Sequence, residues 1–505
     1  MTKLGVCTVL LFCAAVISAP AQTFVSLYDF CSQANCTDGY APYAGLVQGT
    51  DGSLYGTNQW AGVNDAGTLF KITPAGHLTT LYNFCSKLNC TDGSYPFVAL
   101  VLGTDGSFYG TTIEGGTGSA PQCEDVGCGT IFRVSPNGTL TTLYNFCSQS
   151  DCTDGLFPEG ALVEAADGSF YGTTSGGGTN TSCPGDCGTV FRFTPPGTLT
   201  TLYSFCALSN CADGSVPVAG LVQASDGNFY GTTYQGGTAD EGTVFQITST
   251  GTLTTLYSFC SQIGCTDGNF PRAGLVQGTD GNLYGTTNAD KFECVETCGT
   301  VFKITTGGDL TTLHTFCLPG PCVDGSTPYS GLVQATDGNF YGTTAYGGGN
   351  GNGGGTVFKI TSEGALTTLY SFCGPYGCPD GYKLWAGVTQ ATNGTFYGTA
   401  LEGGNISCLG QEFGGCGTVF SLSVGLHPFV EVLPGSGRVG AHVIILGNSL
   451  MGTTSVTFGG TAASFTVASN TLINATIPAG AAAGFVTVTT PGGTRKSNAK
   501  FRVVR

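Results

Sequence analysis

The fold of this chain is decided by the stretch Gly220-Leu-Val-Gln-Ala-Ser-Asp-Gly-Asn-Phe-Tyr-Gly-Thr-Thr233, followed by Gly242-Thr-Val-Phe-Gln-Ile-Thr248 and Leu253-Thr-Thr-Leu-Tyr-Ser-Phe259. This unit recurs seven times, and its Tyr-Gly-Thr core returns every 54 to 62 residues. Self-similarity at such a period indicates a repeat architecture. The seven copies of the core begin at Tyr55, Tyr109, Tyr171, Tyr230, Tyr284, Tyr341 and Tyr397.

Each unit contains four short β-rich segments separated by Asp-Gly and Pro-Gly turns, which predicts an all-β fold of four-stranded blades. The segment 24–30 matches the last strand of a unit, and 417–423 matches the third strand of a unit that lacks its fourth. The two fragments complete one another. We therefore expect a seven-bladed β-propeller that is closed by the N-terminal strand. A β-solenoid is the alternative, although it would not need complementary ends.

The ends of the chain differ in texture from the repeats. Residues 1–21 read as a signal peptide, with Lys3 before an apolar run and a small-x-small cleavage site. No later apolar run is long enough to span a bilayer. Residues 22–424 form the expected propeller, and residues 425–505 contain short strands between Gly and Pro turns, as in a small immunoglobulin-like β-sandwich. We expect an exported protein that is secreted or held at the cell surface.

Composition narrows the range of partners. Only 10% of the 505 residues are charged, and the formal net charge is −16. Nucleic acid and anionic membranes need a basic footprint on the protein, so we expect neither of them as a partner.

The 22 cysteines beyond the signal segment fall into local pairs, which indicates eleven short disulfides in an oxidising compartment. Zinc is the alternative, but no histidine accompanies any pair. Seven pairs have the spacing Cys-x4-Cys: Cys31/Cys36, Cys85/Cys90, Cys147/Cys152, Cys206/Cys211, Cys260/Cys265, Cys317/Cys322 and Cys373/Cys378. The other four are Cys123/Cys128, Cys183/Cys187, Cys294/Cys298 and Cys408/Cys416. The seven Cys-x4-Cys pairs lie in the loops between the last strand of one unit and the first strand of the next, and the other four pairs lie in the loops between the second and third strands. In an up-and-down blade both kinds of loop lie on one rim, where we expect any function.

Two resemblances follow from these motifs. The repeats, with Gly-Leu-Val-Gln, Asp-Gly-Asn-Phe-Tyr-Gly-Thr-Thr and Gly-Thr-Val-Phe-Lys-Ile, resemble the GloVer-type tandem repeat over residues 24–423. That resemblance implies an exported bacterial protein and no particular activity. The segments Ile445-Leu-Gly-Asn-Ser-Leu450, Val456-Thr-Phe-Gly-Gly460 and Gly484-Phe-Val-Thr-Val488 resemble an IPT/TIG domain, which implies a spacer or interaction module.

Motifs that carry chemistry are scarce. The chain has four histidines and no nucleophile elbow, zinc helix or phosphate loop, so we expect no catalytic residues, no metal site and no cofactor. One aspartate per repeat stands in the loop after the last strand. Seven such carboxylates could hold calcium, but we favour an Asp-Gly turn, because sevenfold repetition suits scaffolding better than a unique site. These residues are Asp38, Asp92, Asp154, Asp213, Asp267, Asp324 and Asp380.

A unique site must break the sevenfold pattern. Two rim positions do so: the residue just after the proline position of the cysteine loop, and the residue five after the tyrosine of the Tyr-Gly-Thr core. When the repeats are numbered 1 to 7 along the chain by these cores, the large residues at both positions gather in repeats 6, 7, 1 and 2. Aromatic rings and carboxylates of this kind stack on sugar faces and accept hydrogen bonds from hydroxyl groups; packing between blades is the alternative. The candidate ligand-binding residues are Tyr43, Trp60, Phe97, Glu114, Tyr329, Tyr346, Trp385 and Glu402.

The expected function is that of a non-catalytic extracellular binding or scaffold protein. Its partner would be an extracellular polysaccharide or a cell-surface protein. A polysaccharide-active enzyme is the alternative, and it requires two carboxylates that face one cleft. Glu114, Glu159 and Glu402 are the carboxylates available for that role on the rim.

Overall fold

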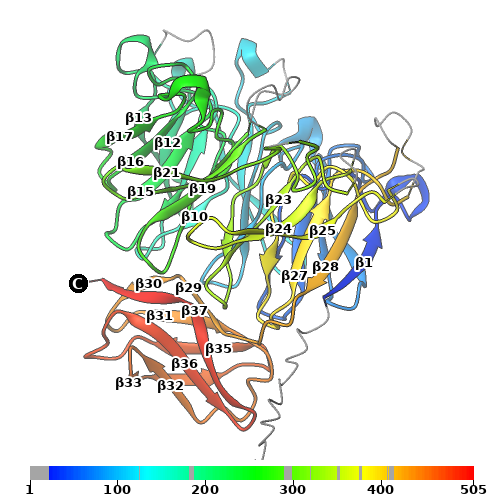
Figure 1. Cartoon of the computed structure of the whole chain (residues 1–505), viewed down its shortest axis with the longest axis vertical. Helices are drawn as coiled ribbons and strands as arrows, with labels where there is room; N and C mark the ends of the chain where they lie inside the picture. Colours follow the sequence, from blue (N-terminus) through cyan, green and yellow to red (C-terminus); the bar gives the residue numbers. More distant parts are fainter. Residues whose placement is uncertain are drawn as a thin grey trace, which may run out of the picture.

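The fold is all-β, with the repeats stacked side by side and a separate C-terminal β domain below them (Figure 1). The computed structural model describes residues 22–123, 126–180, 187–288, 298–318, 320–349, 353–374, 378–405, 408 and 414–504. The predicted signal peptide, Cys183 and Cys294 lie outside these residues.

Each repeat forms one four-stranded antiparallel sheet whose strands pair in chain order, like the blades of a propeller. We number the repeats 1 to 7 by their Tyr-Gly-Thr cores. Repeats 1 to 3 contain β2 (Val47–Gln48), β3 (Leu54–Asn58), β4 (Thr68–Ile72), β5 (Leu78–Asn83); β6 (Val101–Leu102), β7 (Phe108–Thr112), β8 (Thr130–Val134), β9 (Leu140–Asn145); and β10 (Val163–Glu164), β11 (Phe170–Thr174), β12 (Thr189–Thr194), β13 (Thr198–Ser204). Repeats 4 to 6 contain β14 (Val222–Gln223), β15 (Phe229–Thr233), β16 (Thr243–Ile247), β17 (Leu253–Ser258); β18 (Val276–Gln277), β19 (Leu283–Thr287), β20 (Thr300–Ile304), β21 (Leu310–Thr315); and β22 (Val333–Gln334), β23 (Phe340–Thr344), β24 (Thr356–Ile360), β25 (Leu366–Ser371).

The seventh sheet combines the two ends of the repeat region. Its strands are β26 (Thr389–Gln390), β27 (Phe396–Ala400), β28 (Thr418–Ser423) and β1 (Thr23–Asp29). The N-terminal strand pairs antiparallel with β28, from Thr23 opposite Ser423 to Asp29 opposite Thr418, as the complementary fragments predict.

The Tyr-Gly-Thr core joins each repeat to the next. In five of the seven repeats the tyrosine ring packs on a phenylalanine of the following repeat; the centroids of Tyr55 and Phe108, for example, lie 4.1 Å apart. In six of the seven repeats the threonine hydroxyl donates a hydrogen bond to a carbonyl oxygen of the following repeat, such as Thr232 to Ala273 at 3.1 Å. The exception is Thr57 of repeat 1, whose hydroxyl has no partner among the described residues. The last repeat makes the same bond to the first, from Thr399 to the carbonyl of Ala44.

The glycine of the Tyr-Gly-Thr core leaves room for a neighbouring aromatic ring. It lies directly opposite the phenylalanine of the Gly-Thr-Val-Phe motif, as Gly231 lies opposite Phe245. A Cβ atom on Gly231 would lie 2.7 Å from that ring, closer than atoms can pack. The two motifs therefore recur together because each requires the other.

The loops at one end of the repeats carry short 3-10 helices, and this end points away from the C-terminal domain (Figure 1). Five of these helices lie in Cys-x4-Cys loops and one lies in the β7–β8 loop. They are η1 (Ala34–Cys36), η2 (Leu88–Cys90), η3 (Pro121–Cys123), η4 (Ser150–Cys152), η5 (Ser209–Cys211) and η6 (Ile263–Cys265). No helix in the described ranges is long and apolar enough to cross a membrane.

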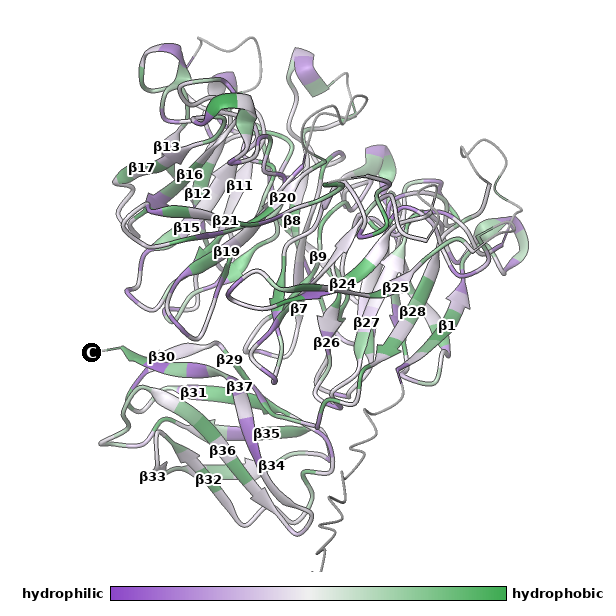
Figure 2. Ribbon diagram, in the orientation of Figure 1, coloured by the Kyte–Doolittle hydropathy of each residue, from purple (hydrophilic) through white to green (hydrophobic). Residues whose placement is uncertain are grey.

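The C-terminal domain consists of two sheets packed face to face around Ile445, Phe458, Ile473, Val488 and Phe501. Apolar residues follow the strands in both domains (Figure 2). One sheet has the order β29 (Glu431–Leu433), β31 (His442–Leu446), β35 (Leu472–Thr476), β34 (Ser464–Val467). The other has the order β30 (Ser436–Arg438), β37 (Gly493–Val504), β36 (Gly484–Thr490), β32 (Ser455–Phe458), β33 (Thr461–Ala462).

The C-terminal domain docks on the ends of the repeats that carry the Asp-Gly turns. The Thr471 hydroxyl donates a hydrogen bond to the carbonyl of Thr50 in repeat 1, and the Asn448 amide donates one to the Thr392 hydroxyl in repeat 7, both at 2.7 Å. Ile444 and Leu446 share an apolar cluster with Tyr55 of repeat 1. The rim of 3-10 helices and cysteine loops remains uncovered by this domain.

Candidate functional site

One residue from each repeat converges on a single small pocket on the loop-rich side. These residues stand just after the proline position of the cysteine loop: Tyr43, Phe97, Glu159, Val218, Arg272, Tyr329 and Trp385. The volume of this pocket, which we call the convergent pocket, is about 80 Å³. Equivalent positions in seven repeats can meet in this way only around a common axis, so the pocket lies at the centre of the repeats.

The aromatic half of the pocket is a continuous chain of rings. Tyr329 and Trp385 are stacked with centroids 4.8 Å apart, Trp385 and Tyr43 meet edge to face at 5.0 Å, and Tyr43 and Phe97 lie 4.9 Å apart. Tyr329 is buried, whereas the other three are partly exposed. Four of the eight candidate ligand-binding residues are therefore brought together.

The other half of the pocket is charged. The Arg272 guanidinium lies over the Tyr234 ring at 4.4 Å and 5.8 Å from the centroid of Tyr329. Across Val218, the Glu159 carboxylate accepts a hydrogen bond from the Ser175 hydroxyl at 2.9 Å. Arg272 forms no ion pair with any described carboxylate, so its charge is available to the pocket.

Two hydrogen-bond donors of this site are buried without a protein acceptor. They are Nε1 of Trp385 and Nε of Arg272, neither of which has a partner among the described residues. Buried donors in folded proteins are nearly always paired with protein or water. Because Trp385 and Arg272 both line the convergent pocket, a polar ligand or water there is the candidate acceptor for these donors.

The second set of candidates lies outside the convergent pocket. Trp60 packs on Tyr95 with centroids 4.7 Å apart. Burial, and after it the negative charge of Glu114, raises the pKa of Tyr95. Tyr346 meets Tyr382 edge to face at 6.2 Å. The backbone of this position forms an isolated β-bridge to the cysteine loop, for example Tyr40 to Trp60.

Glu402 is held in a buried ion pair. Its Oε1 lies 2.9 Å from Nζ of Lys383, and Glu402 is 2% exposed. Burial, and after it the negative charge of Glu402, raises the pKa of the neighbouring Tyr43. Sequence reasoning missed Lys383, although both partners depart from the repeat pattern within repeat 7.

The aspartates of the cysteine loops cap their own loops. Asp267 is fully buried and accepts hydrogen bonds from the Tyr257 hydroxyl at 2.8 Å and from the Ser261 amide at 2.9 Å. The same contacts recur in other repeats, and His314 replaces the tyrosine opposite Asp324 at 2.9 Å. This arrangement supports the turn interpretation rather than calcium ligation.

The described cysteines are paired as their spacing predicts, except Cys187 and Cys298, whose predicted partners lie outside the described residues. Nine disulfides are present: Cys31–Cys36, Cys85–Cys90, Cys123–Cys128, Cys147–Cys152, Cys206–Cys211, Cys260–Cys265, Cys317–Cys322, Cys373–Cys378 and Cys408–Cys416. Cys187 is also disulfide-bonded.

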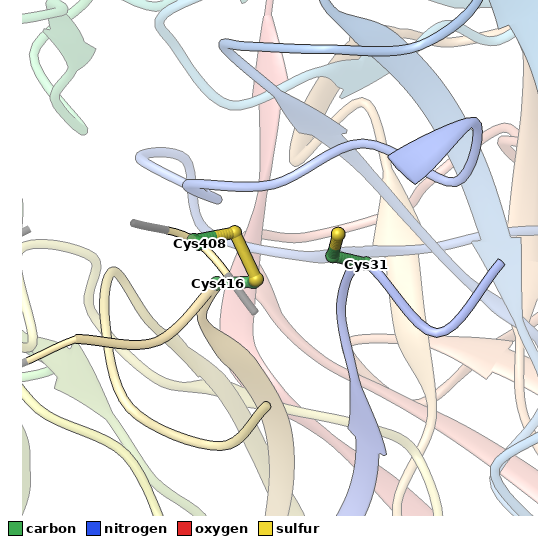
Figure 3. A group of neighbouring side chains, drawn as sticks. All are labelled: Cys31, Cys408 and Cys416. Carbon is green, nitrogen blue, oxygen red and sulfur yellow. A yellow bond between two sulfur atoms is a disulfide. The ribbon is translucent and has the colours of Figure 1, made fainter. Parts of the chain in front are cut away.

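Two groups of three sulfurs among the described residues have the spacing of metal ligands. In the group of Cys298, Cys317 and Cys322, Cys317 is bonded to Cys322. The sulfurs of Cys31, Cys408 and Cys416 lie within 4.8 Å of one another (Figure 3). Cys408 is bonded to Cys416 and Cys31 is bonded to Cys36, so the sulfurs are engaged in disulfides and offer no thiolate to zinc.

A larger hollow of about 720 Å³ lies between the loops of repeats 2 and 3, lined by Gln122, Gln149, Thr179 and Asn180 among others. None of the aromatic or acidic candidates lines it. We therefore regard the convergent pocket, where the repeat pattern is broken, as the candidate site.

The sequence matches the Gloeobacter/Verrucomicrobia repeat over residues 17–221 and 179–420. The chain belongs to this repeat family. An IPT/TIG domain follows at residues 429–503. A comparison with curated proteins found no match.

Solved structures resemble this repeat protein in fold alone. A fungal alcohol oxidase of the AA5 family, in complex with copper, has a TM-score of 0.50 and 13% identity, covering 96% of this chain and 99% of its own. An aldose sugar dehydrogenase from Streptomyces coelicolor, in its PQQ-bound form, has a TM-score of 0.38 and 13% identity, covering 80% and 98%.

Proposed function

We propose that this protein is an exported extracellular scaffold that binds a glycan in the convergent pocket. In this proposal residues 1–21 are a signal peptide, residues 22–424 form a closed seven-bladed propeller, and residues 425–505 form the IPT/TIG domain. The disulfides support export, because such bridges persist in oxidising compartments. The pairing of β1 with β28 and the bond from Thr399 to Ala44 support the closed ring.

The observation that carries the glycan proposal is the pairing of stacked rings with unpartnered donors. Trp385 and Tyr329 line the pocket as a stacked pair of rings, and Nε1 of Trp385 and Nε of Arg272 lack acceptors among the described residues. A sugar ring presents an apolar face and hydroxyl oxygens to the same neighbours, so one ligand satisfies both features. Packing alone would leave these buried donors unpaired.

The carboxylates favour binding over hydrolysis. Of the seven residues that line the pocket, Glu159 is the single carboxylate, and the Glu402 carboxylate is engaged by Lys383. Glycoside hydrolysis usually needs two carboxylates on one cleft. The convergent pocket does not provide that pair.

An array of plant and microbial polysaccharides, probed with the secreted full-length protein, tests the proposal. We expect binding to at least one neutral or acidic glycan, without release of reducing ends. Binding only to proteins of a cell surface, or no binding at all, would overturn it.

A further inference from the structure

A second cavity lies between the C-terminal domain and repeats 6 and 7. Its volume is about 450 Å³, within the range typical of small-molecule sites, which often lie at domain interfaces. Val333 and Val388 line it from the repeats, and Phe429, Glu431 and Lys500 line it from the C-terminal side. Figure 1 shows β29 and β37, which supply this side, facing the repeats.

Strand alternation aims Glu431 away from the core of its own domain. Its neighbours Val430 and Val432 belong to the sandwich core, and successive side chains of a strand point to opposite faces. The Glu431 side chain therefore points toward the repeats, where it borders the cavity.

The Glu431 carboxyl has no partner in this position. It forms no ion pair or side-chain hydrogen bond with the described residues. Burial raises its pKa to about 7. An ionised carboxylate in such surroundings is costly unless a cation or hydrogen-bond donors accompany it.

The C-terminal domain contains several basic residues, yet none of the described ones pairs with Glu431. Glu431 is the only acidic residue in 425–505, a segment that also holds six Lys and Arg residues. Lys500 is the other titratable residue that lines the cavity. Arg495, Lys496 and Arg502 on β37, and His442 on β31, are the remaining charged or titratable groups on the two strands beside β29. None of these groups lies within ion-pair distance of Glu431 in the described structure.

We propose that this interdomain cavity is a second ligand site, which takes a small organic cation. The ammonium group of the ligand pairs with the Glu431 carboxylate, and its apolar body packs against Val333, Val388 and Phe429. The ligand supplies the positive charge that no described Lys or Arg of the domain brings to Glu431. The cavity also removes the apolar surface of the ligand from water. This site is separate from the convergent pocket and does not depend on glycan binding.

Benzylamine is a suitable probe, with benzyl alcohol and benzoate as neutral and anionic controls of similar size. Titration calorimetry of the full-length protein at pH 8 should show binding of benzylamine at least tenfold tighter than binding of either control. Benzylamine stays protonated between pH 6 and pH 8, whereas the ionised fraction of a carboxyl with a pKa of about 7 rises about tenfold over that interval. Its affinity should therefore fall about tenfold at pH 6.

Four variants locate the binding. Glu431→Gln should remove both the preference for the amine and its pH dependence, and Val388→Phe should fill the cavity and abolish binding. Glu363→Gln, an exposed carboxyl in the turn between β24 and β25 that does not line the cavity, should change nothing. Trp385→Ala should also leave binding intact, which excludes an ammonium group stacked on the rings of the convergent pocket.

Equal affinity for benzylamine and benzyl alcohol would overturn the proposal, as would no measurable binding of benzylamine. Retention of the pH dependence in Glu431→Gln would also overturn it. Lys500→Met gives a further check, because it should strengthen benzylamine binding by removing a competing cation. A loss of binding in that variant would contradict the proposed pairing.

Discussion

The hydroxyl of Thr399 donates a hydrogen bond at 3.1 Å to the carbonyl oxygen of Ala44, a residue 355 positions earlier in the chain. Thr232 makes the equivalent bond to Ala273, only 41 positions later, at the same 3.1 Å. The contact between the last and first repeats therefore has the geometry of a contact between consecutive repeats.

Thr399→Val and Thr232→Val should destabilise the protein by similar amounts, about 1–3 kcal/mol each, because each leaves a buried carbonyl without its donor. Chemical denaturation of both variants measures the two changes. If Thr399→Val leaves the free energy of unfolding unchanged while Thr232→Val lowers it, the first and last repeats are not joined like the others.

Gly231→Ala should destabilise the protein by more than about 2 kcal/mol, because the new methyl group meets the Phe245 ring at 2.7 Å. Phe245→Leu in the same chain should restore part of that loss. Gly307→Ala is the matched control, since its nearest atom, in Thr305, lies 3.6 Å away. Equal melting temperatures for Gly231→Ala and Gly307→Ala would contradict the steric account.

Alkaline unfolding should follow the ionisation of buried tyrosines. Burial is the largest cause that raises the pKa of Tyr82, Tyr109, Tyr144 and Tyr230 to about 12, and nearby aspartates add to it. A phenol whose pKa is raised by folding stabilises the fold below its unfolded pKa of about 10 and loses that contribution as the pH rises toward 12. Absorbance at 295 nm and circular dichroism should therefore change together above pH 10. Full tyrosine ionisation near pH 10 with the fold intact would contradict this.

Non-reducing peptide mapping should find eleven local disulfides, including Cys183–Cys187 and Cys294–Cys298. Replacing Cys260 and Cys265 by serine should cost about 2 kcal/mol, the chain-entropy value for so short a loop. Bridges between different loops, or free thiols in the secreted protein, would be incompatible with this pairing.

Local motifs explain why much of the fold was predictable. Tyr-Gly-Thr and Gly-Thr-Val-Phe occupy paired strands, and their spacing predicts the sheets, the cysteine loops and the pairing of 24–30 with 417–423. Each of these features depends on contacts within a repeat or on a repeated contact. Comparison of the copies at one position also identified Tyr43, Phe97, Tyr329 and Trp385, because a position that breaks a repeat stands out from its equivalents.

Contacts that occur once could not be predicted in this way. The two rim positions differ equally from copy to copy, yet only one of them converges on the central pocket, whereas Trp60 turns toward Tyr95. Lys383 and Glu402 each stand at a position that varies among the repeats, and no local motif indicates that these two side chains form an ion pair. The position of Glu431 depends on how the C-terminal domain docks, which no single segment encodes.

Glycan binding in the convergent pocket is tested most directly by substitution of the two tryptophans. Wild-type protein, Trp385→Ala and Trp60→Ala should be titrated with the glycan that the array identifies, alongside thermal unfolding of each. Trp385→Ala should weaken binding by about 1–3 kcal/mol with little change in melting temperature, as the loss of a stacking ring does. Trp60→Ala should bind normally, because Trp60 packs on Tyr95 outside the pocket. Full affinity in Trp385→Ala, or equal losses in both variants, would contradict the account.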